Sequence, residues 1–121
     1  MESKKIMICD DDQGIVEMLY LFLDLEGYQV LCETNSTNLT KQLIAYQPDL
    51  LLFDLWVPVL SGDQLIKIIR NTPEIKNIPI LVLSASVDGR DVAEGLGSNG
   101  FIAKPFDLNE ITSSIHDVLA S

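Results

Sequence analysis

Acidic side chains follow two strongly apolar stretches of the chain, and they are the residues best suited to chemistry. Asp10 and Asp11 come directly after the segment 5–9, and Asp54 ends the apolar run that covers 50–53. Carboxylates in such places serve as nucleophiles or as ligands for a hard divalent cation. An aspartate after a strand is also a common turn or helix cap, so Asp54 alone does not separate a structural role from a chemical one.

The surrounding sequence alternates between strand and helix patterns. Strands are predicted over residues 5–9, 29–33, 50–54, 78–84 and 101–103. Five helices are predicted. The first covers 13–26, and the second follows a loop at 34–38 and carries Leu39, Leu43, Ile44 and Tyr46. The third runs from Gly62 to a stop at 71–73, the fourth covers 87–96, and the fifth follows a capping box at 107–110. This alternation predicts an α/β fold, a doubly wound five-stranded parallel sheet of order 2-1-3-4-5 with five helices, which is flavodoxin-like.

The predicted strand order gathers polar residues at one edge of the sheet. The first and third strands lie side by side, so Asp10, Asp11 and Asp54 become neighbours. Two unit charges about 4 Å apart repel by about 4 kcal/mol at an effective dielectric constant near 20, so the cluster needs a proton or a cation. Mg²⁺ suits it, because Mg²⁺ takes one or two carboxylates together with water and phosphoryl oxygens. Ser84 and Lys104 end the last two strands at the same edge, although an isolated lysine is more often a solvated surface residue.

Composition limits the classes of function. The 121 residues fit one domain, and 18 acidic against 8 basic residues give a net charge of −10. This charge opposes direct nucleic acid binding and binding to anionic membranes. The sequence has no apolar run long enough for a membrane span and no apolar leader after Lys4 and Lys5, so we expect a cytoplasmic protein.

The cysteines and the single histidine have structural interpretations. Cys9 and Cys32 lack the spacing of a metal site, so both are predicted to be buried free thiols. His116 lies on the polar side of the last predicted helix, next to Asp117, and is predicted to be a surface residue.

Taken together, these residues resemble the receiver domain of two-component response regulators. Each shared motif alone is weak evidence for this family, but all of them in this order and at this spacing are highly specific for it. They are Asp10-Asp11, Asp54, Pro58 with Gly62, Ser84-Ala85, and Phe101-x-x-Lys104-Pro105. The resemblance implies one receiver domain over residues 1–121, either standing alone or excised from a longer regulator. It also implies a phosphorylation-activated signalling switch, not a metabolic enzyme.

The resemblance assigns roles to the acidic residues. Asp54 is implied to be the phosphoacceptor, which takes the phosphoryl group from a sensor histidine kinase or a phosphotransfer protein. Mg²⁺ is implied to bind Asp11, Asp54 and the backbone carbonyl of Trp56 directly, and Asp10 through water. The domain is then expected to catalyse its own phosphorylation and dephosphorylation.

The resemblance also assigns roles at the ends of the last two strands. Ser84 and Lys104 are implied to contact the phosphoryl group, and Ser84 and Phe101 to form the switch, in which the aromatic ring turns inward on activation. The switch would change the face formed by the last helices and strand, where a downstream effector that the sequence does not identify would bind. Neither the cognate kinase nor the oligomeric state follows from these motifs.

Three other classes of protein share parts of the pattern. A haloacid-dehalogenase-like phosphatase begins with Asp-x-Asp, which Asp10-x-Asp12 matches, but Gln13 and Gly14 lack the expected hydroxyl. A flavodoxin-like electron carrier shares the fold, yet its phosphate loop needs Ser, Thr and Gly amides where this chain has three aspartates. A receiver-like interaction module that no longer accepts phosphate is disfavoured by the intact acidic set.

Trp56 generates a prediction about the lifetime of the phosphorylated form. It is unusually bulky for a position two residues after the phosphoacceptor, and by the resemblance Trp56 and Ser86 flank the path of water to the aspartyl phosphate. The indole should shield this path, so we expect slow self-dephosphorylation. Trp56→Asn should speed the loss of phosphate several-fold, on the order of 1 kcal/mol in barrier, measured as decay of the phosphorylated mass. An unchanged decay rate with efficient phosphorylation would instead assign the indole to surface packing after Gly62.

Overall fold

A computed structural model describes residues 4–10, 12–54, 62–84, 95 and 97–120. The described strands are β1 (Lys5–Cys9), β2 (Gln29–Glu33), β3 (Leu50–Asp54), β4 (Ile80–Ser84) and β5 (Gly100–Ala103). The described helices are α1 (Gln13–Leu25), α2 (Ser36–Tyr46), α3 (Gly62–Arg70) and α5 (Leu108–Ala120). All strands are parallel in the order β2-β1-β3-β4-β5, which confirms the predicted fold class. The described ranges contain four helices, and the predicted fifth, over 87–96, falls almost entirely outside them.

The predicted strand boundaries are close to those of the structure. β1, β2 and β3 match the predicted ranges residue for residue, and β5 begins one residue earlier than predicted. The prediction was wrong for the start of β4, which begins at Ile80 and not at Ile78. Pro79 explains the difference, because proline has no N–H to donate to a sheet ladder, although its carbonyl accepts a hydrogen bond from the N–H of Leu51 at 2.9 Å.

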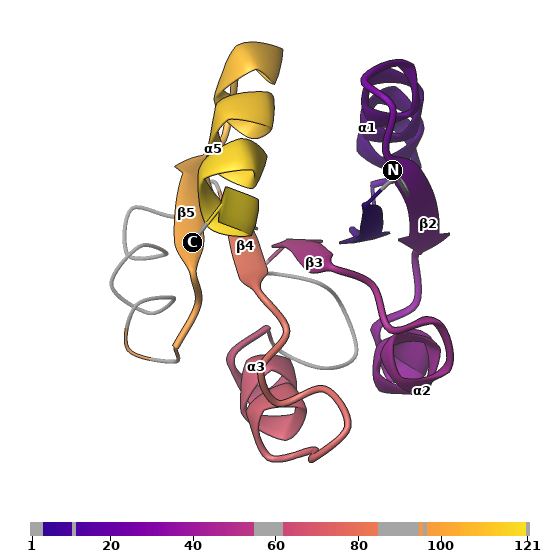
Figure 1. The fold of residues 1–121 in the computed structure, drawn as a ribbon, viewed down its shortest axis with the longest axis vertical. Coiled ribbons are helices and arrows are strands. Elements are labelled where there is room, and N and C mark those ends of the chain that lie inside the picture. Colours follow the sequence, from indigo (N-terminus) through magenta and orange to yellow (C-terminus); the bar gives the residue numbers. More distant parts are fainter. Residues whose placement is uncertain (1–3, 11, 55–61, 85–94, 96, 121) are drawn as a thin grey trace.

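The core has two layers, one on each face of the sheet. α1 and α5 cover one face, and α2 and α3 cover the other (Figure 1). Side chains alternate between these layers along each central strand, so that Leu52 packs with the α1–α5 layer and Phe53 with the α2–α3 layer. Every residue of β3 and β4 is buried, as their continuous apolar sequences predict for central strands.

Side-chain caps set the helix starts. Asp12 caps α1, and its Oδ1 accepts a hydrogen bond from the N–H of Ile15 at 3.2 Å. Asn35 caps α2, so this helix begins inside the segment predicted as a loop. The predicted capping box before α5 is present, since the Glu110 carboxylate accepts a hydrogen bond from the N–H of Asp107 at 3.2 Å. Gly27 follows α1 with a φ of 95°, a left-handed conformation that favours glycine.

The edge position of β2 corrects one prediction. Cys9 is a buried free thiol as predicted, but Cys32 is exposed, because β2 is an edge strand with no described strand beyond it. His116 is exposed on α5, in agreement with its prediction. Of the helices described, none combines the length and the apolar character needed to cross a membrane.

Arg70 at the end of α3 connects three segments in a way that the sequence did not reveal. Its guanidinium donates to the carbonyl of Gly97 from Nη2 at 2.8 Å and to the carbonyl of Ile78 from Nη1 at 2.7 Å. Nη2 also donates to Asn99 Oδ1 at 3.1 Å, and the same oxygen accepts from the N–H of Ile80 at 2.9 Å. Arg70 therefore anchors the starts of β4 and β5 to α3.

We expect Arg70→Met to lower the free energy of unfolding by about 2 kcal/mol, because several carbonyls lose a charged donor. Lys67→Met is the matched control, since Lys67 is exposed on the same helix, and it should change stability by less than about 0.5 kcal/mol. Urea denaturation followed by circular dichroism measures both. Equal midpoint urea concentrations for the two variants would show that the Arg70 contacts contribute little to the stability of the fold.

Candidate functional site

The strand register brings the predicted residues together at the carboxyl edge of the sheet. Cys9 of β1 pairs with Phe53 of β3, so the residues that follow them, Asp10 and Asp54, are neighbours. On the other side of β3, β4 ends at Ser84, which pairs with Ala103 of β5. Lys104 follows β5 directly and so reaches the same edge.

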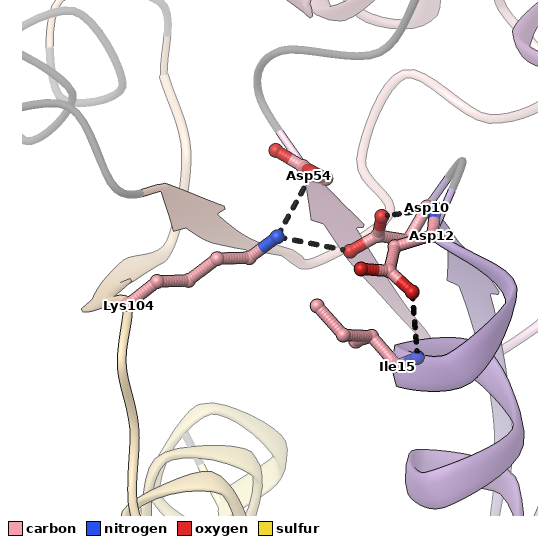
Figure 2. Close-up of polar contacts among 5 residues, drawn as sticks. All are labelled: Asp10, Asp12, Ile15, Asp54 and Lys104. Atoms are coloured by element: carbon pink, nitrogen blue, oxygen red, sulfur yellow. Dashed lines mark hydrogen bonds and ion pairs between the residues drawn. The ribbon is translucent and has the colours of Figure 1, made fainter.

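Lys104 joins the two carboxylates directly. Its ammonium Nζ donates to Asp54 Oδ2 at 2.9 Å and to Asp10 Oδ2 at 3.2 Å (Figure 2). The lysine side chain is only 18% exposed, so the alternative of a solvated surface lysine is wrong. The sequence predicts that a metal ion neutralises the negative charge of the carboxylates. In the structure Lys104 neutralises part of that charge.

Burial strengthens this ion pair. Asp10 and Ser84 are each 1% exposed and Asp54 is 7% exposed. Charges removed from water interact more strongly with each other, but each also loses hydration, so the geometry must be good for the cluster to be tolerated. Asp10 meets this requirement with a second contact, because its Oδ1 accepts a hydrogen bond from the N–H of Asp12 at 2.9 Å.

The pKa values of Asp10 and Lys104 are shifted by burial and by neighbouring charges. Burial raises the pKa of Asp10 above its ordinary value of 3.8; the Asp12 N–H lowers it in part, and the charge of Asp54 raises it further. Burial by itself would lower the pKa of Lys104, but the hydrogen bond to Asp54 and the charges of both carboxylates outweigh it, and the pKa is raised. Lys104 is therefore fully charged at neutral pH.

The two residues predicted to form the switch lie on adjacent strands. Ser84 is buried at the end of β4, beside the acidic residues. Phe101 of β5 is half-buried and packs against the core layer beneath α2 and α3, and it pairs in register with Val82. Of the predicted metal ligands, Asp10 and Asp54 are together, while Asp11 and Trp56 lie outside the described residues.

The donor set fits a hard divalent cation. Two buried carboxylates converge at this edge, and carboxylate oxygens are the ligands that Mg²⁺ prefers. Within the residues that the structure describes, no group of three or more His, Cys, Asp or Glu side chains is close enough to hold a metal ion. A bound ion would therefore need further ligands, such as the predicted Asp11 carboxylate and Trp56 carbonyl. Mg²⁺ remains a prediction.

Some neighbours of the site were not singled out from the sequence. Ile15, Met18 and Phe106 line an apolar groove next to Lys104. The sequence signal that could have revealed this groove is the row of apolar residues along the helix 13–26. Met18 extends this row beyond the buried face of the helix, since it is 39% exposed.

Comparisons with known proteins find related sequences over nearly the whole chain. Residues 6–116 match the family model described as the response regulator receiver domain. GtcR, a response regulator of Aneurinibacillus migulanus, is 37% identical over 93% of this chain and 46% of its own length. The phosphate regulon transcriptional regulatory protein PhoB of Pseudomonas aeruginosa is 31% identical over 98% of this chain and 53% of its own. The chain thus spans about half the length of these relatives.

A solved structure shows the same fold over the full chain. The crystal structure of a protein described as a response regulator from Chloroflexus aurantiacus superposes with a TM-score of 0.94 and 30% sequence identity. The superposition covers 99% of this chain and 100% of that chain.

Asp10→Asn should stabilise the protein at pH 7 by about 1 kcal/mol in buffer without divalent cations. A carboxyl group whose pKa is raised on folding stabilises the fold only below its unfolded pKa, and this contribution is lost as the pH rises through the folded pKa. The amide cannot ionise, so the advantage of the variant should shrink toward pH 4. Chemical denaturation at several pH values measures this. A variant less stable than the natural protein at pH 7 would show that the bond to Lys104 outweighs burial and repulsion.

Proposed function

Since the chain belongs to the response regulator receiver domain family, we propose that it is a phosphorylation-activated switch in which Asp54 accepts a phosphoryl group from the phosphohistidine of a sensor histidine kinase or phosphotransfer protein. The observation that carries this proposal is the contact of the Lys104 ammonium with Asp54 at 2.9 Å beside the buried Asp10. A nucleophilic carboxylate next to a fixed positive charge suits the transfer of an anionic group.

Family membership also decides between the alternatives raised by the sequence. The family model covers residues 6–116, and neither a dehalogenase-like phosphatase nor a flavodoxin-like electron carrier is needed to explain any motif. A receiver-like module that does not accept phosphate belongs to the same family, and the experiment below separates it from the proposed switch.

The transfer step uses Asp54 as the nucleophile. A carboxylate oxygen of Asp54 forms a bond to phosphorus, the bond from phosphorus to the imidazole nitrogen of the donor breaks, and its electron pair stays on that nitrogen. Lys104 neutralises charge on the phosphoryl oxygens, and the Ser84 hydroxyl donates a hydrogen bond to the transferred group. In this step Lys104 exchanges its bond to Asp54 for one to the phosphoryl group.

The proposed cofactor is Mg²⁺. Asp11, Asp54 and the carbonyl of Trp56 would hold it directly, and Asp10 would hold it through water. When bound, the ion would supply positive charge to the phosphoryl oxygens as a Lewis acid. Lys104 and Mg²⁺ together would balance a site that carries three carboxylates before the phosphoryl group arrives.

Ser84 and Phe101 are the proposed switch. A new bond from Ser84 to the phosphoryl group would pull on the end of β4, and Phe101, half-buried on the adjacent strand, would turn inward. The face formed by the last helices and strand would then change for an effector. The net charge of −10 makes direct contact of this domain with nucleic acid unfavourable, so an output on DNA would require another part of a longer regulator.

Incubation with acetyl phosphate and Mg²⁺ should add one phosphoryl group to the protein, and Asp54→Asn should abolish the addition, because an amide is not a nucleophile here. Intact mass measures the change, and a chelator should prevent it in the natural sequence. Asp24→Asn, which changes an exposed carboxylate on α1, is the matched control and should be phosphorylated normally.

Two results would contradict the proposal. Full phosphorylation of Asp54→Asn would place the acceptor at another residue. No phosphorylation of the natural protein, under conditions in which Mg²⁺ is present and the protein is folded, would favour a module that does not accept phosphate.

A further inference from the structure

The outer edge of β2 is open to another strand. β2 pairs with β1 on one side, and no strand in the described part of the chain pairs with its other side (Figure 1). The N–H of Gln29 donates to the carbonyl of Lys4 at 2.9 Å, so the main-chain groups of Gln29 and of every second residue after it face β1. Those of Val30 and Cys32, between them, point away from the sheet. Their N–H and C=O groups are therefore available to a further strand.

An apolar groove of about 390 Å³ lies beside this edge, between α1 and the end of β2. Tyr20 and Leu21 of α1 and Cys32 of β2 line it, and Leu21 is 62% exposed. Val30 packs with the core layer beneath α1, so Val30 and Cys32 direct their side chains to the face of the sheet that carries the groove. A strand added to β2 would place every second side chain on this same face, against the groove.

The two elements that form the groove carry only negative charges. α1 contains Glu17 and Asp24, β2 contains Glu33, and neither element has a lysine, arginine or histidine. Glu17 lines the groove itself. The carboxylate of Glu33 is held at the end of the strand, where it accepts a hydrogen bond from the N–H of Asn35 at 3.0 Å. The edge is thus an apolar surface bordered by carboxylates, which favours a partner with positive charge.

We propose that the edge of β2 binds an extended segment of a partner protein, apolar at alternate positions and carrying lysine or arginine. The segment adds a strand to the sheet. Main-chain hydrogen bonds to Val30 and Cys32 supply affinity, and the groove with Glu17 supplies selectivity. The site is separate from the phosphoacceptor, because β1 lies between β2 and the strand that ends in Asp54.

A second copy of this chain suits the edge less well. Its own β2, with the sequence Gln-Val-Leu-Cys-Glu, carries a carboxylate and no cation, and each chain has a net charge of −10. Antiparallel pairing of two β2 strands would also bring both copies of α1 to one face of the joined sheet. Their carboxylates, Glu17 and Asp24 in each copy, would then repel one another.

Two capped peptides test the pairing. One is Lys-Thr-Val-Thr-Val-Thr-Lys, whose lysines and valines lie on the same side of an extended strand, and in the other glutamates replace both lysines. Titration calorimetry with the full chain measures the affinity for each. We expect the lysine peptide to bind about tenfold more tightly than the glutamate peptide, because the border of the groove is acidic.

Variants of the groove test where this preference arises. Glu17→Lys should reverse it, weakening the lysine peptide and strengthening the glutamate peptide, while Leu21→Ser should weaken both about fivefold through lost apolar contact. Glu74→Lys is the control for charge, since Glu74 is exposed between α3 and β4 and does not line the groove. Leu25→Ser is the control for apolar area, since Leu25 is exposed on α1 outside the groove. Both controls should bind as the natural protein does.

Amide hydrogen exchange followed by NMR identifies the paired edge without any substitution. In the free protein the amides of Val30 and Cys32 should exchange quickly, and those of Gln29 and Leu31, which face β1, should exchange slowly. Saturation with the lysine peptide should slow exchange at Val30 and Cys32 about tenfold and leave the other two nearly unchanged.

Three results would overturn the inference. Failure of the lysine peptide to bind would remove the edge as a docking site for such segments. Binding without protection of Val30 and Cys32 would place the peptide elsewhere on the protein. Slow exchange of these two amides in the free protein, lost on dilution, would assign the edge to a second copy of the chain. Phosphorylation of Asp54 would stand in all three cases.

Discussion

The contact of one lysine with two buried aspartates is the interaction on which the site depends. Asp10 and Asp54 follow adjacent central strands, and without a positive charge between them their burial at 1% and 7% exposure would be costly. Lys104 supplies that charge from the end of β5. The sheet makes this contact possible, because its strands are all parallel, β1 and β3 are neighbours, and Lys104 at the end of β5 reaches the same edge.

The sequence predicted the fold because its strongest signals are local and repeated. The continuous apolar segments of β1, β3 and β4 identify central strands, and the caps at Asp12 and Asp107 mark helix starts that the structure contains. Errors occurred where a signal depends on neighbours in space. Pro79 lies in an apolar, strand-like segment but has no N–H to donate. Cys32 is exposed because β2 is an edge strand, a position that the predicted strand order already gave it.

The candidate site was predicted as a set of residues but not as a set of contacts. The motifs identified Asp10, Asp54, Ser84 and Lys104, and the structure gathers them at one edge. The contacts of Lys104 with both Asp10 and Asp54 depend on the length and direction of its side chain, which cannot be read from the spacing of residues in the sequence. The anchor at Arg70 was missed for the same reason, because its acceptors are mostly backbone carbonyls and carry no sequence signal.

The bond between Asp10 and Lys104 joins residues 94 positions apart, which directly follow the first and the last strand along the chain. A contact of such long range closes most of the chain into one loop, so the pairing of the strands between its ends must offset the conformational entropy lost on closure. Asp54 therefore gains its positive neighbour only when β5 has docked on β4. A chain emerging from the ribosome would carry Asp54 long before it carried Lys104, so the charge balance of the site is reached only after the last strand has joined the sheet.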